Sequence, residues 1–153
     1  MTCFVIKYDM RLPAIARPSP QLYAAAIAQG VWADRNGFGT LMLAEHHGSD
    51  DGYLPSPLLL AAAIAAQTER MRIRVQALIL PFHDPIRIAE DMAVLDIISR
   101  GRAEVTVAGG YVASEFAMFG VTLADRGRLV EEGVQAMRHA WTGERFVFRG
   151  RSV

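Results

Sequence analysis

Two adjacent histidines stand at the end of a short apolar run, in the stretch LMLAEHHGSDDGYLPSP at residues 41–57. An imidazole has a pKa near neutrality, so a ring in this position can bind or move a proton. It can also be an ordinary loop histidine that hydrogen-bonds a neighbouring carboxylate. From the residue types alone, an acid–base role for His46 or His47 and this structural role are equally open.

Metal binding is the third chemistry that histidines can supply here. Neighbouring residues of an extended strand point to opposite faces, so His46 and His47 would not hold one ion from the same side. Further ligands would have to come from elsewhere, for example from His83 and Asp84, and no spacing in the chain matches a known metal motif. We therefore expect no metal site.

A glutamine and a glycine pair also stand out. Gln76 lies inside IRVQALIL, where the apolar neighbours predict a strand buried on both faces. A buried amide needs hydrogen-bond partners, so Gln76 either lines a ligand cavity or bonds a neighbouring strand. The glycines of VAGGYVASEF, at residues 107–116, allow close backbone approach to a phosphate or a planar ring, but they lack the spacing of a G-x-G-x-x-G motif.

The composition is that of a globular protein. The 153 residues are 52% hydrophobic and carry a formal net charge of zero, so no basic excess points to nucleic acid. Charged residues and prolines interrupt the apolar runs, which argues against a membrane span, and no secretory leader is recognisable. Cys3 is the single cysteine and excludes an internal disulfide. We expect one cytoplasmic domain over residues 1–153.

Strands and helices alternate along the chain. Runs rich in β-branched and aliphatic residues predict four strands: CFVIKYDM, TLMLAEHH, RIRVQALILP and RAEVTVAGG. The stretches between them begin with a capping residue followed by proline, at Ser19-Pro20, Ser56-Pro57 and Asp84-Pro85. Two helix ends are predicted at Asn36-Gly37 and Arg100-Gly101. The last stretch, ERFVFRGRSV, is either one more short strand or a hairpin arm.

This alternation predicts a parallel sheet covered by helices. An open doubly wound sheet and a (β/α)8 barrel both fit the pattern. A complete barrel needs about 250 residues, so this chain would supply about half of one. In either fold the functional groups gather at the carboxyl ends of the strands. These ends lie at residues 8–9, 45–47, 81–84 and 108–111, which we expect on one rim.

Several motifs, taken in order, resemble those of the bacterial luciferase-like monooxygenase family. They are AEHH, LP-x-H-DP-x-R-x-A-E-D-x-A-x-LD-x-x-S-x-GR, GGY-x-x-x-EF-x-x-FG and R-x-R-x-x-EE. The resemblance extends from Phe4 to about Arg151. It is specific because the motifs share their order and spacing, whereas any one of them alone would be weak.

The resemblance implies a (β/α)8 barrel rather than an open sheet, with this chain supplying about the first four β/α units. It also implies a flavin-dependent monooxygenase that uses reduced FMN and molecular oxygen to oxygenate a small organic substrate. A separate flavin reductase is the implied source of the reduced FMN. The alternative within the family is an oxidoreductase that uses a deazaflavin coenzyme for hydride transfer.

The same resemblance implies roles for single residues. His46 matches the family's active-site histidine, which lies near the flavin ring and assists its reaction with oxygen. His47 matches a less essential neighbour, and we expect it and the acidic loop GSDDGY to form a supporting, solvated rim. Glu115 matches an acidic position close to the flavin.

Four further residues would contact the cofactor. The Gln76–Ala77 bond falls where many members have a non-proline cis peptide packed against the flavin ring. Ala108 stands where the luciferase large subunit has a reactive cysteine, and Gly109 where it has an arginine associated with the flavin phosphate. Both departures argue against light emission and against that particular phosphate contact, but not against a flavin.

The length of the chain leaves open how the half-barrel is completed. A four-stranded parallel sheet has two edge strands with unpaired backbone groups. The chain is then a fragment of a longer protein, one half of a homodimer in which two copies complete a barrel, or a truncated, non-catalytic remnant. We favour a fragment.

Overall fold

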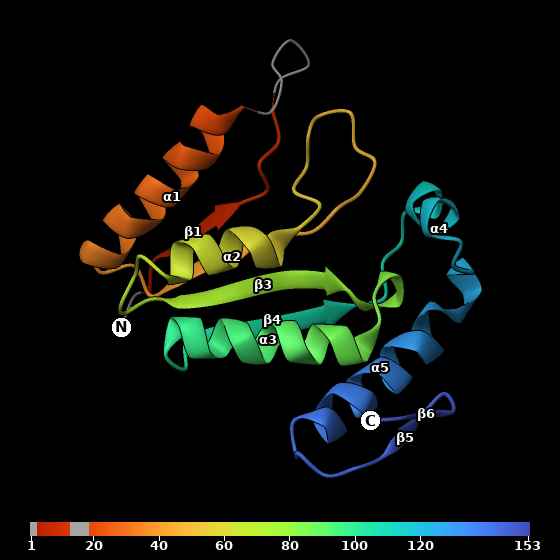
Figure 1. Cartoon of the computed structure of the whole chain (residues 1–153). Helices are drawn as coiled ribbons and strands as arrows, with labels where there is room; N and C mark the ends of the chain where they lie inside the picture. The colour runs from red at the N-terminus through yellow and green to blue at the C-terminus, as the bar shows by residue number, and fades with distance from the viewer. Residues whose placement is uncertain (1–2, 13–18) are drawn as a thin grey trace.

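The computed structural model describes residues 3–12 and 19–153 (Figure 1). Four strands form one parallel sheet in the order β1-β2-β3-β4. They are β1 (Val5–Tyr8), β2 (Thr40–Leu43), β3 (Arg72–Ile79) and β4 (Ala103–Ala108). All four predicted strands are confirmed, and each ends before the polar or glycine residues that follow it in the sequence.

The three helices between these strands begin at the predicted prolines. They are α1 (Pro20–Arg35), α2 (Pro57–Ala65) and α3 (Pro85–Ser99). Ser19 Oγ accepts a hydrogen bond from the Leu22 N–H, and Asp84 caps α3 in the same way. The helix end at residue 100 is also confirmed, because Arg100 adopts the left-handed conformation with a φ of 58°.

The last third of the chain adds two helices and a hairpin. A short helix, α4 (Ala113–Phe119), is followed by α5 (Arg126–Ala140), and two single turns, η1 (Leu80–Phe82) and η2 (Leu123–Asp125), precede α3 and α5. The final segment is an antiparallel hairpin of β5 (Val147–Phe148) and β6 (Arg151–Ser152), which decides between the two predicted alternatives. The hairpin lies beside α5 (Figure 1), where Arg149 pairs with Glu132 at 3.2 Å.

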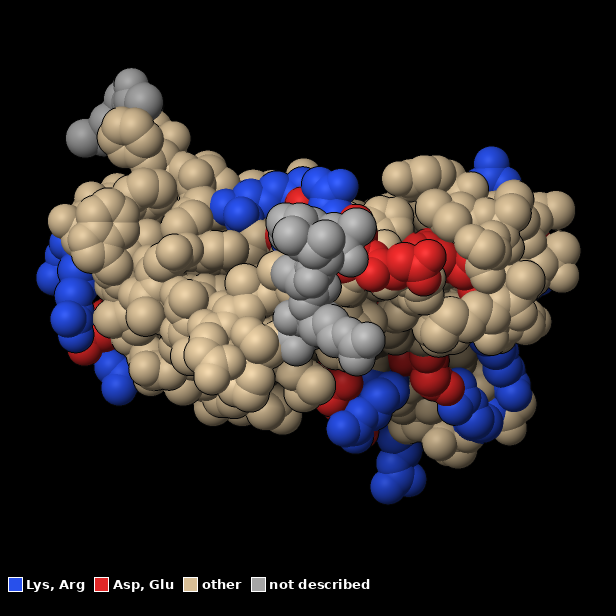
Figure 2. Space-filling view, turned by 90° about the horizontal axis from the view of Figure 1, so that it is seen from above, with Lys and Arg blue, Asp and Glu red and all other residues tan. Residues whose placement is uncertain are grey.

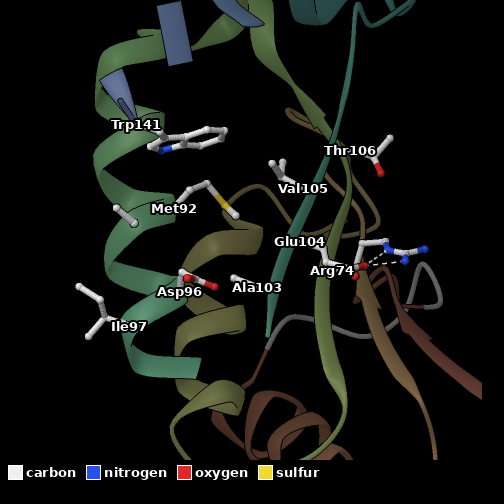
Figure 3. Close-up of a pocket in the computed structure, with 10 residues that line it drawn as sticks. Arg74, Met92, Asp96, Ile97, Ala103, Glu104, Val105, Thr106 and Trp141 are labelled. Atoms are coloured by element: carbon white, nitrogen blue, oxygen red, sulfur yellow. Dashed lines mark hydrogen bonds and ion pairs between the residues drawn. The ribbon is translucent and has the colours of Figure 1, made fainter. Parts of the chain in front are cut away.

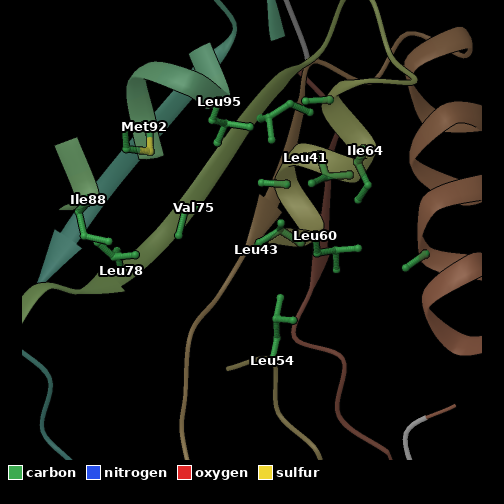
Figure 4. Close-up of a cluster of buried hydrophobic side chains, with 14 of the residues drawn as sticks. Leu41, Leu43, Leu54, Leu60, Ile64, Val75, Leu78, Ile88, Met92 and Leu95 are labelled. Atoms are coloured by element: carbon green, nitrogen blue, oxygen red, sulfur yellow. The ribbon is translucent and has the colours of Figure 1, made fainter. Parts of the chain in front are cut away.

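The helices pack on one face of the sheet, with α2 over β3 and α3 over β4 (Figure 1). Figure 4 shows the resulting core, in which strand side chains meet the inward faces of α2 and α3. These core residues are Leu41, Leu43, Val75 and Leu78 from the strands, with Leu60, Ile64, Ile88, Met92 and Leu95 from the helices. Each such side chain stabilises the fold by roughly 1.5 to 3 kcal/mol through burial.

The opposite face of the sheet is polar and partly exposed, which corrects the prediction that the third strand is buried on both faces. Lys7, Met42, Arg74 and Glu104 are in register across the four strands on this face. The Arg74 guanidinium donates to Glu104 Oε2 at 2.6 Å. Only one layer of helices covers the described sheet, and in a closed barrel this face would point inward.

A buried aspartate joins α1 to the start of β3. Asp34 is 5% exposed, and its carboxylate accepts the backbone N–H groups of three consecutive residues, Glu69, Arg70 and Met71, at 2.7 to 3.0 Å. Burial alone would raise the pKa of Asp34, but these three donors lower it below its usual value. The turn that leads into β3 is therefore held by charge-assisted hydrogen bonds.

Arg102, which directly precedes β4, makes an equally dense set of bonds. Its guanidinium donates to four backbone carbonyls and one hydroxyl, at distances of 2.6 to 3.1 Å. The acceptors belong to Ala65, Thr68, Met71 and Ser99. One side chain thus ties the ends of α2 and α3 to the beginnings of β3 and β4.

Figure 2 shows one face of the molecule, most of which is uncharged, with Lys and Arg side chains in separate groups near its margins. No helix within the described residues is long and apolar enough to cross a membrane.

Replacing Arg102 by Met should lower the free energy of unfolding by about 2 to 4 kcal/mol, because several partly buried carbonyls lose their donor. Urea unfolding followed by circular dichroism measures this change. The matched control is Arg70→Met, since the Arg70 side chain is exposed, and it should change stability by less than about 0.5 kcal/mol. Equal stability of both variants would contradict a structural role for the Arg102 guanidinium.

Candidate active site

The carboxyl ends of the strands meet at one rim, as the parallel sheet predicts. The segment after β2 is joined to the segment after β1 through Leu54, whose N–H donates to the Asp9 carbonyl and whose carbonyl accepts from the His46 N–H. The same segment contacts the ends of β3 and β4 through Glu45–His83 and His46–Tyr111 pairs. Residues from all four predicted strand ends therefore lie together.

His46 is bonded to a carboxylate that lies 69 residues further along the chain. Its Nδ1 lies 2.8 Å from Oε1 of Glu115, which is 3% exposed and comes from α4. The same oxygen accepts the backbone N–H of His47 at 2.9 Å. Because a carboxylate oxygen accepts, the bond assigns a proton to Nδ1 and leaves Nε2 of the neutral ring as a proton acceptor.

Two tyrosines flank the His46 ring. Tyr53 meets it edge-on with ring centroids 4.6 Å apart, and Tyr111 does so at 5.9 Å. The His46 side chain is nevertheless 23% exposed, so a ligand at the rim can reach it. Packing holds the ring plane in place while one edge of the imidazole faces outward.

The second oxygen of Glu115 accepts no hydrogen bond from the described residues. Oε2 is buried, and no hydrogen bond within residues 3–12 and 19–153 reaches it. An unpaired buried carboxylate oxygen is costly, and such atoms are rare in native structures. Glu115 Oε2 therefore marks a position at which a bound ligand can donate an N–H or an O–H.

Glu45 lies at the centre of a second polar group on the other side of the same segment. Its side chain is fully buried, and Oε1 accepts from His47 Nε2 at 2.9 Å and from His83 Nε2 at 2.7 Å. Oε2 accepts the Ile79 N–H at 2.6 Å. Burial alone would raise the pKa of Glu45, but these donors together lower it to about 2.

This arrangement corrects one prediction and adds residues that the sequence reasoning did not select. His47 is not part of a solvated rim, since its side chain is 7% exposed and bonded to Glu45. Glu45 and His83 were not predicted as site residues. Strand periodicity is the sequence signal that could have identified Glu45. Residues two apart in a strand point to the same side, so Glu45 is expected to pair with His47, and His46 is expected to point away from both.

The Gln76–Ala77 peptide bond is cis, as the family resemblance implied. The pairing of β3 with β4 is irregular here, because Gln76 pairs with Thr106 and Leu78 with Val107, so Ala77 has no partner in the register. Gln76 is partly exposed, on the face of the sheet that the helices do not cover. It is thus available to a ligand rather than enclosed in the core.

Ala108 and Gly109 lie at the carboxyl end of β4, where the sequence places them. The stem of Arg126, the first residue of α5, lies over Gly109, and a Cβ atom at that glycine would stand 3.5 Å from the Arg126 Cγ. Gly110 has a φ of 73°, and a Cβ there would come within 2.8 Å of Ile79. Gly110 therefore lets the end of β3 and Phe116 of α4 approach closely, whereas a Cβ at Gly109 would make an ordinary contact with Arg126.

A wide cavity lies elsewhere in the molecule. About 840 Å³ opens along the outer edge of β4, between that strand, Trp141 and α3 (Figure 3). Its lining includes Met92 and Ile97 on one side, and the Arg74–Glu104 pair on the other. None of the predicted site residues lines this cavity, so we treat it as an open sheet edge and not as the active site.

Solved structures match this fold closely. Monooxygenase RslO1 from Streptomyces bottropensis superposes with a TM-score of 0.89 at 30% identity, over 98% of this chain and 46% of that one. The oxygenating constituent of 3,6-diketocamphane monooxygenase from Pseudomonas putida, solved with FMN, superposes with a TM-score of 0.89 at 24% identity, over 99% of this chain and 42% of that one. The fold is therefore about half of a luciferase-like barrel, as predicted.

The sequence comparisons agree with the structural ones. The family model for luciferase-like monooxygenases matches residues 8–153. The chain is 31% identical over 126 residues to the oxygenase component of flavin-dependent trigonelline monooxygenase from Acinetobacter baylyi, covering 81% of this chain and 35% of that protein. It is 32% identical over 111 residues to limonene 1,2-monooxygenase from Rhodococcus erythropolis, covering 72% of this chain and 29% of that protein.

The chain therefore belongs to the luciferase-like monooxygenase family, which confirms the resemblance read from its motifs. It spans about a third of the length of these curated relatives.

Replacing Glu45 by Gln should destabilise the fold in a pH-dependent way. The folded-state pKa of about 2 lies below the ordinary value of 4.5, so ionised Glu45 stabilises the fold above about pH 4.5, and this contribution is lost as the pH falls through about 2. The stability difference between wild type and Glu45→Gln should be on the order of 3 kcal/mol near neutral pH. It should shrink towards zero in acid.

Urea unfolding across this pH range measures the difference. Glu144→Gln is the matched control, because Glu144 is exposed, and its stability difference from wild type should stay small at every pH. A Glu45→Gln effect that does not change with pH would show that the carboxylate charge is not what stabilises this segment.

Proposed function

We propose that this chain carries the flavin-facing part of a flavin-dependent monooxygenase, which uses reduced FMN and molecular oxygen to oxygenate a small organic substrate. The observation that carries the proposal is the His46–Glu115 pair at the rim, in which one imidazole nitrogen is available and one carboxylate oxygen has no partner among the described residues. The flavin-dependent and FMN-bound relatives support the choice of cofactor.

The residues at the rim fit a flavin in three ways. Glu115 Oε2 can accept a hydrogen bond from an N–H of the ring or a hydroxyl of the ribityl chain. Gln76 and Ala77, within β3, are partly exposed and offer a surface for a planar ring. Ala108 and Gly109 leave the end of β4 free of bulky side chains at the rim.

When bound, reduced flavin supplies the two electrons with which one atom of oxygen enters the substrate and the other leaves as water. The chain's own contribution is to hold and move protons at His46 Nε2. Glu115 keeps the ring in the tautomer whose Nε2 accepts. Tyr53 and Tyr111 contact two sides of that imidazole and limit how far its ring can turn.

Arg126 is the residue that we assign to the flavin phosphate. The sequence has glycine at position 109, where the resemblance implies a phosphate-associated arginine in luciferase. The stem of the exposed Arg126 side chain lies over that glycine, and its guanidinium, which donates to the Leu123 carbonyl at 3.0 Å, could turn towards a phosphate from this different element. A guanidinium suits a phosphate because it donates two parallel hydrogen bonds.

The reduced cofactor would come from a separate reductase, in keeping with the relative named as an oxygenase component. The substrate pocket would be completed by residues beyond this half of the barrel or by a second copy of the chain. The deazaflavin oxidoreductase and the non-catalytic remnant are the alternatives that the following experiment distinguishes.

Titration of the purified chain with FMN, followed by fluorescence quenching, should show saturable binding, and a deazaflavin coenzyme should bind more weakly. When the chain loaded with reduced FMN is mixed with oxygen, His46→Ala should slow flavin oxidation by about 100-fold, the scale expected of a proton-transferring group. His139→Ala is the matched control and should behave as wild type, since His139 is exposed on α5.

Failure of a folded chain to bind either coenzyme would favour the remnant. Preference for the deazaflavin would favour hydride transfer over oxygenation. Equal oxidation rates in wild type and His46→Ala would remove His46 from the mechanism.

Replacing Arg126 by Ala should weaken FMN binding by about 10-fold or more, since the loss of a charge-assisted bond costs roughly 1.5 to 3 kcal/mol. Riboflavin, which has no phosphate, should bind wild type and Arg126→Ala equally. Arg128→Ala is the control from the same helix turn, because Arg128 is engaged by Asp125 and Glu132. A similar loss in both variants, or a loss for riboflavin as well, would contradict the phosphate assignment.

A further inference from the structure

We propose that Glu45, His47 and His83 form a binding site for one divalent transition-metal ion. The site is distinct from the proposed flavin contact, because it uses the side of the segment opposite His46. Neither the family match nor the named relatives carry this inference, which rests on the convergence of three ligand-type side chains.

The three side chains converge on a single point. Glu45 Oε1 lies 2.9 Å from His47 Nε2 and 2.7 Å from His83 Nε2, and these three ligand atoms all lie within 4.8 Å of one another. Two imidazoles and one carboxylate are a set that binds zinc, iron and related ions. Ligand atoms that lie 2.0 to 2.2 Å from a tetrahedral ion are about 3.3 to 3.6 Å apart. Binding would therefore move the Glu45 oxygen away from each nitrogen by roughly 0.4 to 0.9 Å, and it would bring the two imidazole nitrogens to the same separation from each other.

The elements that present the three ligands are well anchored. Glu45 and His47 are two residues apart in the segment after β2, and the 2.9 Å bond between them places both side chains on the same side of it. His83 follows η1 and stands next to Asp84, the cap of α3. Glu45 Oε2 accepts the Ile79 N–H, and such a bond to the second carboxylate oxygen is the kind of outer contact that orients a metal ligand.

The charge of the cluster also favours a cation. Glu45 is fully buried, and in the described part of the chain its side-chain partners are the two histidines and no Lys or Arg. A buried carboxylate needs a compensating positive charge or a dense set of donors. A divalent ion between Glu45 and the two imidazoles would provide that charge directly.

A groove gives the site access to solvent. It lies between α2 and α3, has a volume of about 450 Å³ and reaches both Glu45 and His83. The His83 side chain lines this groove and is 25% exposed, whereas the His47 side chain is nearly buried. An ion could therefore enter from this side, and a water molecule from the groove could complete its coordination.

The choice of ligands predicts which ions bind. Nitrogen donors from two imidazoles favour Zn²⁺ or Co²⁺ over Ca²⁺ and Mg²⁺, which prefer all-oxygen sites. We therefore use Zn²⁺ as the probe for affinity and Co²⁺ as the probe for geometry, because its visible absorption reports the number and type of ligands.

The experiment is calorimetric titration of the intact, metal-stripped chain with Zn²⁺, together with native mass spectrometry. Wild type should bind one ion, and His83→Gln should bind at least about 10-fold more weakly. The glutamine amide can still donate to Glu45, so this variant should keep its fold, which circular dichroism checks. His139→Ala and His46→Ala are the matched histidine controls and should bind like wild type.

Co²⁺ should give a visible spectrum typical of four or five nitrogen and oxygen ligands in wild type, and this spectrum should be lost in Glu45→Gln. Absence of zinc binding by a folded, metal-stripped chain would overturn the proposal and leave a purely hydrogen-bonded cluster. Equal binding in wild type and His83→Gln, or a loss confined to His139→Ala, would also overturn it, because the ion would then sit elsewhere.

Discussion

A single buried carboxylate joins the ends of two neighbouring strands in this protein. Glu45 follows β2, and its two oxygens accept from the backbone at the end of β3, from the loop after it and from His47. The polypeptide after β2 therefore cannot move relative to the end of β3 without breaking several bonds to a buried charge. That constraint positions His46, which is covalently the next residue and points to the opposite side.

The candidate active site depends on this anchoring and on one long-range contact. His46 and Glu115 are 69 residues apart, and they meet because β2 and β4 run parallel and end at the same rim. Glu115 bonds the His46 ring and the His47 backbone with the same oxygen, so the ring and the main chain are oriented together. The two polar groups, one around Glu45 and one around Glu115, both include residues of the segment from Glu45 to His47, and they lie on different sides of it.

The opposite end of the sheet is held by charges of a different kind. Asp34 and Arg102 bond mostly to backbone groups, so they fix the turns that enter β3 and β4 rather than any ligand. This division is typical of β/α barrels, in which one end of the strands carries stability and the other carries function. The polar inner face with Arg74 and Glu104 belongs to neither end, and it is the part of this half-barrel that the described residues leave uncovered.

Local sequence signals were sufficient for the strands and for the helix starts at serine or aspartate before proline, because each depends on neighbouring residues alone. The alternation of strands and helices then predicted a parallel sheet, whereas the order of its strands comes from the structure. The motifs also identified the family, and with it His46, Glu115 and the cis bond at Gln76. The sequence by itself could not reveal that Glu45, His47 and His83 converge, or that Arg126 lies over Gly109. Those contacts join residues on different elements, and only tertiary packing, which aligns the strand ends and brings α3 and α5 against them, decides which side chains meet.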